Sequence, residues 1–116
     1  MAIQPLEAKV RHAPNLAIID LRGVIDGLAE DALNAAYAET VGHNAGAVLL
    51  NFSGVDFINS TGIALIVGLL AQARKSGRRM LTCGLSEHYA EIFRITRLSD
   101  FMTIYPDEQS ALDQSR

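Results

Sequence analysis

One stretch decides the fold, and it reads Phe57-Ile58-Asn59-Ser60-Thr61-Gly62-Ile63-Ala64-Leu65-Ile66-Val67-Gly68-Leu69-Leu70. Polar residues at positions 59–61 separate a strand-like run from a longer apolar run. Either Ser60 or Asn59 can accept hydrogen bonds from the free backbone amides that begin a helix. A basic turn and a glycine follow at residues 74–77, as is typical of a helix end. The stretch therefore predicts a helix over about residues 60–76.

The first three turns of this helix are apolar almost all round. Such a pattern predicts a helix that is buried on most of its surface, with a polar N-terminal tip as its exposed part. The apolar run is shorter than the roughly 18 residues that indicate a membrane span. The sequence therefore predicts no direct insertion into a membrane.

Outer strands are predicted near both ends of the chain. Residues 6–12 alternate apolar and polar side chains, which indicates a half-exposed edge strand. Residues 16–25 form a longer apolar run that predicts a second strand next to it, and Gly23 within this strand indicates a bulge or a close backbone approach. Residues 102–105 predict a short last strand at the other edge.

Two central strands flank the organising helix. Residues 47–52 are mostly apolar and end at Ser53-Gly54, which predicts a strand buried on both faces. Residues 79–85 repeat the pattern after the helix. The order strand, helix, strand predicts a right-handed parallel unit, so we expect a sheet that is at least partly parallel.

Three further helices are predicted by their caps and apolar spacing. Asp26 can cap a helix over residues 28–40 that ends at Gly42. Its predicted inward stripe is Leu28, Ala32, Leu33, Ala36 and Tyr37. Ser86 can cap a third helix, and Pro106 can start a short fourth one. The chain thus predicts an α/β fold of about five strands and four helices, with residues 1–116 forming one domain.

Composition narrows the functional classes. The 116 residues are 49% hydrophobic and have a net charge of -3, which is typical of one globular domain without a nucleic-acid surface. The single cysteine, Cys83, lies in an apolar run and predicts a buried free thiol in a reducing compartment. The start of the chain lacks a basic segment followed by an apolar core, so we expect no secretory signal and a cytoplasmic location.

The run Asp56-Phe57-Ile58-Asn59-Ser60-Thr61-Gly62-Ile63, with its apolar helix and basic-glycine stop, resembles the central signature of STAS domains. That family is named for sulphate transporters and anti-sigma factor antagonists. The step Gly23-Val24-Ile25-Asp26 also resembles the family's junction between second strand and first helix. The resemblance covers nearly the whole chain and implies a STAS-like mixed sheet with helices on one principal face.

A function follows from the resemblance. In the antagonist branch, the serine at the position of Ser60 is phosphorylated by a partner protein kinase. The resemblance therefore implies a protein-binding switch that engages a serine kinase or anti-sigma factor. The partner-binding residues would be Asp26, Asp56, Asn59, Ser60, Thr61 and Gly62. Asn59 is a departure, because the antagonist branch usually has aspartate there.

Plainer interpretations of the same residues remain open. Ser60 has the position of an ordinary helix-start hydroxyl, and Thr61 is either a second phosphate acceptor or a residue packed in the first turn. Asp26 and Asp56 are either caps and turn residues or an acidic pocket that binds the kinase or its nucleotide-linked metal. A different function is that of a free-standing STAS accessory subunit of a membrane transporter or lipid-transport ATPase.

Catalysis has little support in the sequence. Ser60 is not in a Gly-x-Ser-x-Gly elbow, and no phosphate-binding Gly-x-x-x-x-Gly-Lys loop occurs. The three histidines fall in separate places, which predicts surface residues and neither a base nor a metal site. We expect no enzyme activity, no cofactor and no bound metal, and no pattern indicates self-association.

Overall fold

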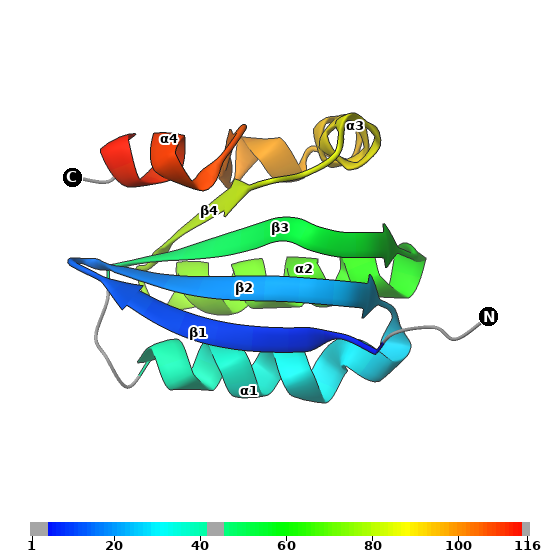
Figure 1. Cartoon of the computed structure of the whole chain (residues 1–116), viewed down its shortest axis with the longest axis horizontal. Helices are drawn as coiled ribbons and strands as arrows, with labels where there is room; N and C mark the ends of the chain where they lie inside the picture. Colours follow the sequence, from blue (N-terminus) through cyan, green and yellow to red (C-terminus); the bar gives the residue numbers. More distant parts are fainter. Residues whose placement is uncertain (1–4, 42–45, 115–116) are drawn as a thin grey trace.

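The computed structural model describes residues 5–41 and 46–114. Its centre is a five-stranded sheet in the order β1-β2-β3-β4-β5 (Figure 1). The strands are β1 (Glu7–Ala13), β2 (Leu16–Ile25), β3 (Ala47–Ile58), β4 (Arg79–Cys83) and β5 (Thr103–Tyr105). β1 is antiparallel to β2, and the other neighbouring pairs are parallel. The predicted mixed sheet, with the first and last strands at its edges, is confirmed.

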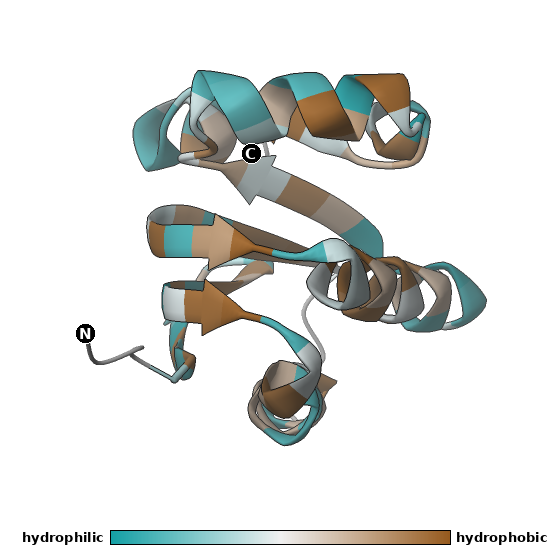
Figure 2. Ribbon diagram, turned by 90° about the vertical axis from the view of Figure 1, so that its right-hand side faces the viewer, coloured by the Kyte–Doolittle hydropathy of each residue, from teal (hydrophilic) through white to brown (hydrophobic). Residues whose placement is uncertain are grey.

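In the residues that the structure describes, four α-helices and two short 3-10 turns accompany the strands. They are η1 (Gly27–Ala29), α1 (Glu30–Val41), α2 (Ser60–Lys75), α3 (Glu87–Ile95), η2 (Leu98–Asp100) and α4 (Glu108–Gln114). Figure 1 shows α1 and α2 running along the strands, and α3 and α4 grouped beyond β4. Figure 2 shows hydrophobic residues concentrated on the strands, while each helix alternates hydrophobic and hydrophilic residues.

The sheet separates two hydrophobic cores. The larger core contains Val48, Leu50 and Phe52 of β3 with buried residues of α1, α2 and α3. The smaller core contains Leu49 of β3 with Ala111 of α4. Because successive residues of a strand point to opposite faces, α4 covers the face opposite to the other helices. The expectation of helices on one principal face is therefore right for α1 to α3 and wrong for α4.

β3 is longer than predicted, because it continues to Ile58 through the residues Ser53-Gly54 that were expected to end it. β2 is long enough to pair with this extension, and Ile25 lies opposite Ile58. The register shifts between Gly23 and Val24, and Gly23 has a φ of 104°. The irregularity predicted at Gly23 is confirmed. The register places the extra residue, Asp56, on β3.

α1 begins differently from the prediction. Asp26 does act as a cap, since its Oδ1 accepts a hydrogen bond from Leu28 N at 3.0 Å, but the capped turn is the 3-10 turn η1. A 3-10 turn has three residues per turn, so it moves Leu28 out of phase with the helix that follows. Leu28 is 89% exposed, and Ala29 is buried in its place. Three other residues of the predicted stripe are buried, namely Leu33, Ala36 and Tyr37. The expected stop at Gly42 lies outside the described residues.

α2 confirms the predicted helix but not its predicted burial. Its buried residues are Gly62, Ile66, Leu69, Leu70 and Ala73, which all lie on one face. The outer face exposes Ala64, Val67, Gly68 and Ala71. No described element covers this face, because α2 rests on one side of a single sheet. α2 is therefore a half-exposed helix whose outer face is apolar.

Candidate functional site

The candidate site lies where β2 and β3 end next to each other. These parallel strands finish at the paired residues Ile25 and Ile58, so the segments that follow them start at the same edge of the sheet. Asp26 follows β2 and begins η1, and Asn59 follows β3 and begins α2. Carboxyl edges of parallel strands are common places for ligand and partner sites in α/β folds. We call residues Asn59 to Gly62 the α2 tip.

Asn59 is the residue that caps α2. Its Oδ1 accepts a hydrogen bond from Gly62 N at 2.8 Å. Its own amide donates to Ile25 O at 3.2 Å and ties the start of α2 to the end of β2. Of the two caps that the sequence left open, the structure selects Asn59. Asparagine meets the geometric need of an N-cap without adding a negative charge.

Ser60 is the first residue of α2, and its side chain is exposed. In the part of the chain that the structure describes, no hydrogen bond is made by the Ser60 hydroxyl. Thr61 is also exposed, and its Cγ2 lies 3.5 Å from the place that a Cβ on Gly27 would occupy. The methyl group of Thr61 therefore packs beside η1, while the Ser60 hydroxyl is accessible.

Gly62 is buried at the point where α2 approaches β2 most closely. A Cβ at this position would lie 2.1 Å from Ile25 O and 3.0 Å from Ile58 Cγ2. No side chain fits without a shift of the backbone, because the nearest atom is a main-chain carbonyl. Gly62 therefore sets the distance between α2 and the ends of both strands.

Two acidic residues were predicted beside the α2 tip, and they differ in role. Asp56 precedes the tip in the sequence, and Asp26 follows the neighbouring strand β2. Asp26 is half-buried and uses its carboxylate to cap η1. Asp56 is the exposed extra residue of the bulge in β3. No group of three or more His, Cys, Asp or Glu side chains that could hold a metal occurs among residues 5–41 and 46–114. His12 and His88 are exposed, as expected, and His43 lies outside the described residues.

Tyr89 of α3 is a positioning residue that the sequence pattern missed. Its hydroxyl accepts a hydrogen bond from Ile58 N at 2.9 Å. β4 pairs with β3 only as far as Asn51, so the residues of β3 that follow Asn51 have no β4 partner on that side. The sequence pattern predicted only the helix that carries Tyr89 and not this contact. A half-buried tyrosine usually finds a hydrogen-bond partner for its hydroxyl, and this tendency was the only sign in the sequence that Tyr89 would make a polar contact.

Two large hydrophobic residues are exposed close to the α2 tip. Leu28 is in η1, beside Gly27 and therefore near Thr61, and Phe57 precedes Ile58 at the end of β3. Leu28 is 89% exposed and Phe57 is 52% exposed. Exposed large apolar groups at a strand edge are a common feature of protein-binding surfaces. The sequence pattern missed both: Leu28 was assigned to the inward stripe of a helix, and Phe57 was considered only as the end of a strand-like run.

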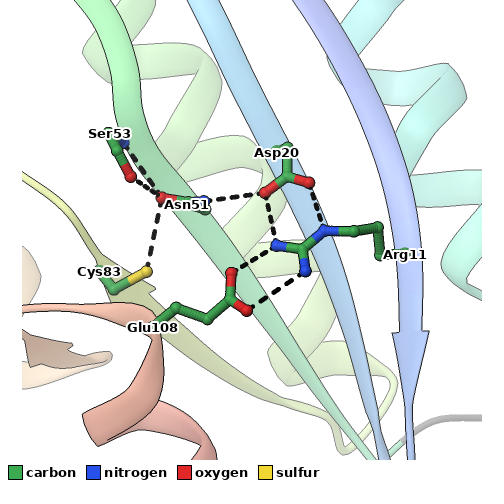
Figure 3. A network of polar contacts seen from close by, with 6 residues as sticks. All are labelled: Arg11, Asp20, Asn51, Ser53, Cys83 and Glu108. Atoms are coloured by element: carbon green, nitrogen blue, oxygen red, sulfur yellow. Dashed lines mark hydrogen bonds and ion pairs between the residues drawn. The ribbon is translucent and has the colours of Figure 1, made fainter.

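A polar network occupies the opposite face of the sheet and joins β1, β2 and β3 to α4 (Figure 3). Arg11 Nη2 donates to Asp20 Oδ1 at 2.9 Å, and the same guanidinium forms an ion pair with Glu108 of α4. Asn51 Nδ2 donates to Asp20 Oδ1 at 2.8 Å. The Arg11 guanidinium lowers the pKa of Asp20. This network fastens α4 to the sheet.

Cys83 lies at the inner end of that network and is buried and free. Its Sγ lies 3.6 Å from Asn51 Oδ1. Burial raises the pKa of the Cys83 thiol to about 11. A thiol with such a pKa stays protonated at neutral pH and is a poor nucleophile. The prediction of a buried cysteine is confirmed.

Comparison with known proteins identifies the family. The family model described as "STAS domain" matches residues 7–111. The chain belongs to the STAS domain family. A relative from Bordetella bronchiseptica, BtrV, which is described as an anti-sigma factor antagonist, is 29% identical over 91 residues, which are 78% of this chain and 76% of BtrV. Further relatives, named as anti-sigma-B factor antagonists, are matched over 53% of their own length.

Solved structures share the STAS fold. The anti-sigma factor antagonist from Mycobacterium paratuberculosis has a TM-score of 0.80 at 19% identity, covering 94% of this chain and 92% of that one. The Bacillus cell fate determinant SpoIIAA in its phosphorylated form has a TM-score of 0.71 at 21% identity, covering 94% and 99%. Among the helices of the described residues, none is long and apolar enough to cross a membrane.

Proposed function

We propose that this STAS domain is a phosphorylation-switched anti-sigma factor antagonist. It would bind an anti-sigma factor that is also a serine protein kinase, through the α2 tip and the adjoining outer face of α2. Phosphorylation of Ser60 would release that partner. The observation that supports this most directly is the exposed Ser60 hydroxyl, which is free of the capping role that Asn59 performs.

The position of Ser60 suits a phosphate. The first amides of an α-helix have no partner inside the helix, and Asn59 uses the amide of Gly62. The amides of Ser60 and Thr61 therefore remain available, and the helix dipole favours negative charge at this end. A phosphate on Ser60 would change the charge of the surface without requiring the domain to unfold.

The surface around Ser60 suits a protein partner. From Ser60 to Ala73, α2 has no charged residue, and its outer face exposes the small apolar group Ala64, Val67, Gly68 and Ala71. Leu28 and Phe57 add two large exposed apolar side chains near the tip. Such a surface can be covered by an apolar partner patch at little desolvation cost, while the acidic Asp26 and Asp56 stand at its margin.

The experiment compares Ser60 variants in kinase and binding assays with the cognate partner. A phosphate adds about 1.5 to 2 negative charges at pH 7. With a partner carboxylate about 5 Å away and an effective dielectric near 20, each charge costs roughly 3 kcal/mol, which is about two decades of affinity. Ser60→Ala should therefore accept no phosphate and bind constitutively, and Ser60→Asp should bind weakly. Both should melt close to wild type, since Asn59 keeps the cap.

Thr61→Ala is the matched control, because it removes a neighbouring exposed hydroxyl from the same turn. It should still be phosphorylated, because Ser60 is unchanged. Phosphate incorporation that persists in Ser60→Ala, or tight binding by the Ser60 phosphoform, would contradict the proposal. Copurification with a transporter in place of a kinase would favour the accessory-subunit function.

A further inference from the structure

A basic pocket lies at the opposite end of α2 from Ser60. It has a volume of about 360 Å³, and its lining residues come from the C-terminal end of α2, the start of β4, and the η2–β5 connection. α2 has 16 residues, so the pocket is about 24 Å from the α2 tip at 1.5 Å per residue. This separation places the pocket away from Ser60 and the α2 tip.

Three arginines line the pocket, namely Arg74, Arg78 and Arg79. Among the described residues that line the pocket, Asp100 is the acidic one, and its Oδ2 already accepts from Arg97 Nε at 2.8 Å. The negative charge of Asp100 is therefore neutralised by Arg97, which does not line the pocket. Positive charge remains in excess, and a concave surface with walls of one sign concentrates anions.

Two of these arginines are held in place by aromatic rings. The Arg74 guanidinium lies 4.8 Å above the centre of the Phe101 ring. Arg78 lies 5.3 Å above the ring of Tyr37, and its Nη1 donates to Thr40 Oγ1 at 3.0 Å. Cation–π contacts fix a guanidinium without using its hydrogen atoms as donors. Arg74 therefore keeps donors for a ligand while its position is already set.

The position of Arg79 is not explained by the usual preference for basic residues at the end of a helix. Basic residues such as Arg74 are usual in the last turn of a helix, where they compensate the dipole. Arg79 lies beyond that turn, as the first residue of β4, and its side chain is exposed. No ion pair or side-chain hydrogen bond holds Arg79 within the described part of the chain.

The rest of the lining is apolar or neutral. Phe101 is 54% exposed, and Met80 and Met102 are buried beneath the pocket. Ser99 and Thr103 add hydroxyl groups that can donate to an anion. The pocket thus combines guanidinium donors, hydroxyl donors and one exposed aromatic ring.

We propose that this pocket binds a small phosphate-bearing molecule, whose phosphate contacts Arg79 and Arg74 and whose aromatic or apolar portion lies against Phe101. Guanidinium groups bind phosphate oxygens by paired charge-assisted hydrogen bonds. A volume of about 360 Å³ is at the lower end of the range of ligand pockets, which restricts the ligand to a small molecule.

The test is an NMR titration of the ¹⁵N-labelled full chain with phenyl phosphate, with phenol and inorganic phosphate as the two half-ligands. Phenyl phosphate should shift the amides of residues 78–81 and 99–103 and bind more tightly than either half. Arg79→Gln and Arg74→Gln should each weaken phenyl phosphate binding by about tenfold or more, as the loss of a charge-assisted hydrogen bond requires. Arg79→Lys should retain more affinity than Arg79→Gln, because it keeps the charge.

Arg22→Gln is the matched control. Arg22 is an exposed arginine on β2, away from the pocket lining, and its replacement changes the net charge by the same amount. It should leave the affinity unchanged. An equal loss in Arg22→Gln would mean general attraction to a charged surface and would overturn the proposal. The proposal would also fail if millimolar phenyl phosphate shifted no pocket amides, or shifted only those of the α2 tip. None of these outcomes depends on whether Ser60 is phosphorylated.

Discussion

Replacing Gly62 by alanine should destabilise the domain, whereas the same replacement at Gly68 should stabilise it. Both glycines lie in α2, so the pair compares one change in two environments. A Cβ at Gly62 would meet Ile25 O at 2.1 Å and Ile25 C at 2.8 Å, while a Cβ at Gly68 would have no atom within 4 Å. The first contact is with main-chain atoms, so α2 or β2 must move by more than an ångström.

The expected magnitudes follow from two opposing effects. Alanine gains up to about 1 kcal/mol over glycine in a helix interior, because it loses less backbone entropy. Overpacking at a tight site costs about 1 to 3 kcal/mol, and contact with a main-chain carbonyl places Gly62 at the upper end of that range. We therefore expect Gly62→Ala to lose about 2 kcal/mol and Gly68→Ala to gain about 0.5 to 1 kcal/mol.

The measurement is urea denaturation of both variants and the wild type, followed by circular dichroism. A difference of about 3 kcal/mol between the variants separates their midpoints by about 2 M if the slope is about 1.5 kcal/mol per molar urea. The slope itself should be unchanged, because the native surface is nearly the same. A midpoint for Gly62→Ala at or above that of the wild type would refute the close approach of α2 to Ile25.

Two further predictions concern polar groups of the fold. Asn59→Ala should lose about 1 kcal/mol of unfolding free energy, because Gly62 N loses its capping acceptor, while Asn59→Asp should keep most of the stability. Urea denaturation checks this, and equal stability of all three proteins would contradict the cap. Arg11 lowers the pKa of Asp20 below its ordinary 3.8, so the carboxylate stabilises the fold above that pH and the gain is lost as the pH falls through the lowered pKa. The pair is partly exposed, so the wild type should lose no more than about 1 kcal/mol of this stabilisation below about pH 5, and Asp20→Asn should not show this loss. The measurement is the urea midpoint of both proteins against pH, and parallel curves for the two proteins would contradict the pairing.

Local patterns predicted most of the elements, because caps and turns act over a few residues. Ser86 was expected to cap a helix, and its Oγ accepts from Tyr89 N at 3.2 Å. The bounds of β2 agree with the predicted residues 16–25, because a turn precedes this strand and the Asp26 cap follows it. Where a short-range hydrogen bond decides the conformation, the sequence contains the whole cause.

Long-range strand pairing decided one feature that the patterns missed, and a local change of helical pitch decided another. Ser53-Gly54 has the composition of a strand end, but β2 offers a partner up to Ile25, and the bulges allow β3 to follow it. Leu28 fits a helical stripe, but a single 3-10 turn changes its phase and turns it outward. In both cases the predicted type of element was correct. A strand distant in sequence changed where β3 ends, and one turn of different pitch changed which residue is buried.

The candidate sites differ in the same way. The α2 tip is one continuous run, so sequence reasoning found Asn59, Ser60 and Gly62 together. The contact between Tyr89 and Ile58 joins two elements that are separated by a helix and a strand. The basic pocket likewise combines α2 and β4 with the η2–β5 connection, and the arginines were visible only as a basic stretch after a helix. A site made from several segments requires the fold before it can be recognised.

The division of roles between Asn59 and Ser60 explains how one turn could serve both stability and the proposed switch. If Ser60 were the cap, a phosphate on its hydroxyl would change the very group that accepts from the helix amides, and the capping hydrogen bond would have to be made again by a phosphate oxygen. Asn59 caps Gly62 N instead, and Gly62 holds α2 against Ile25. The Ser60 hydroxyl can therefore change its charge without removing the hydrogen bond of Asn59 that caps the helix. The energy of a phosphate would then act on whatever binds the α2 tip and leave the fold intact.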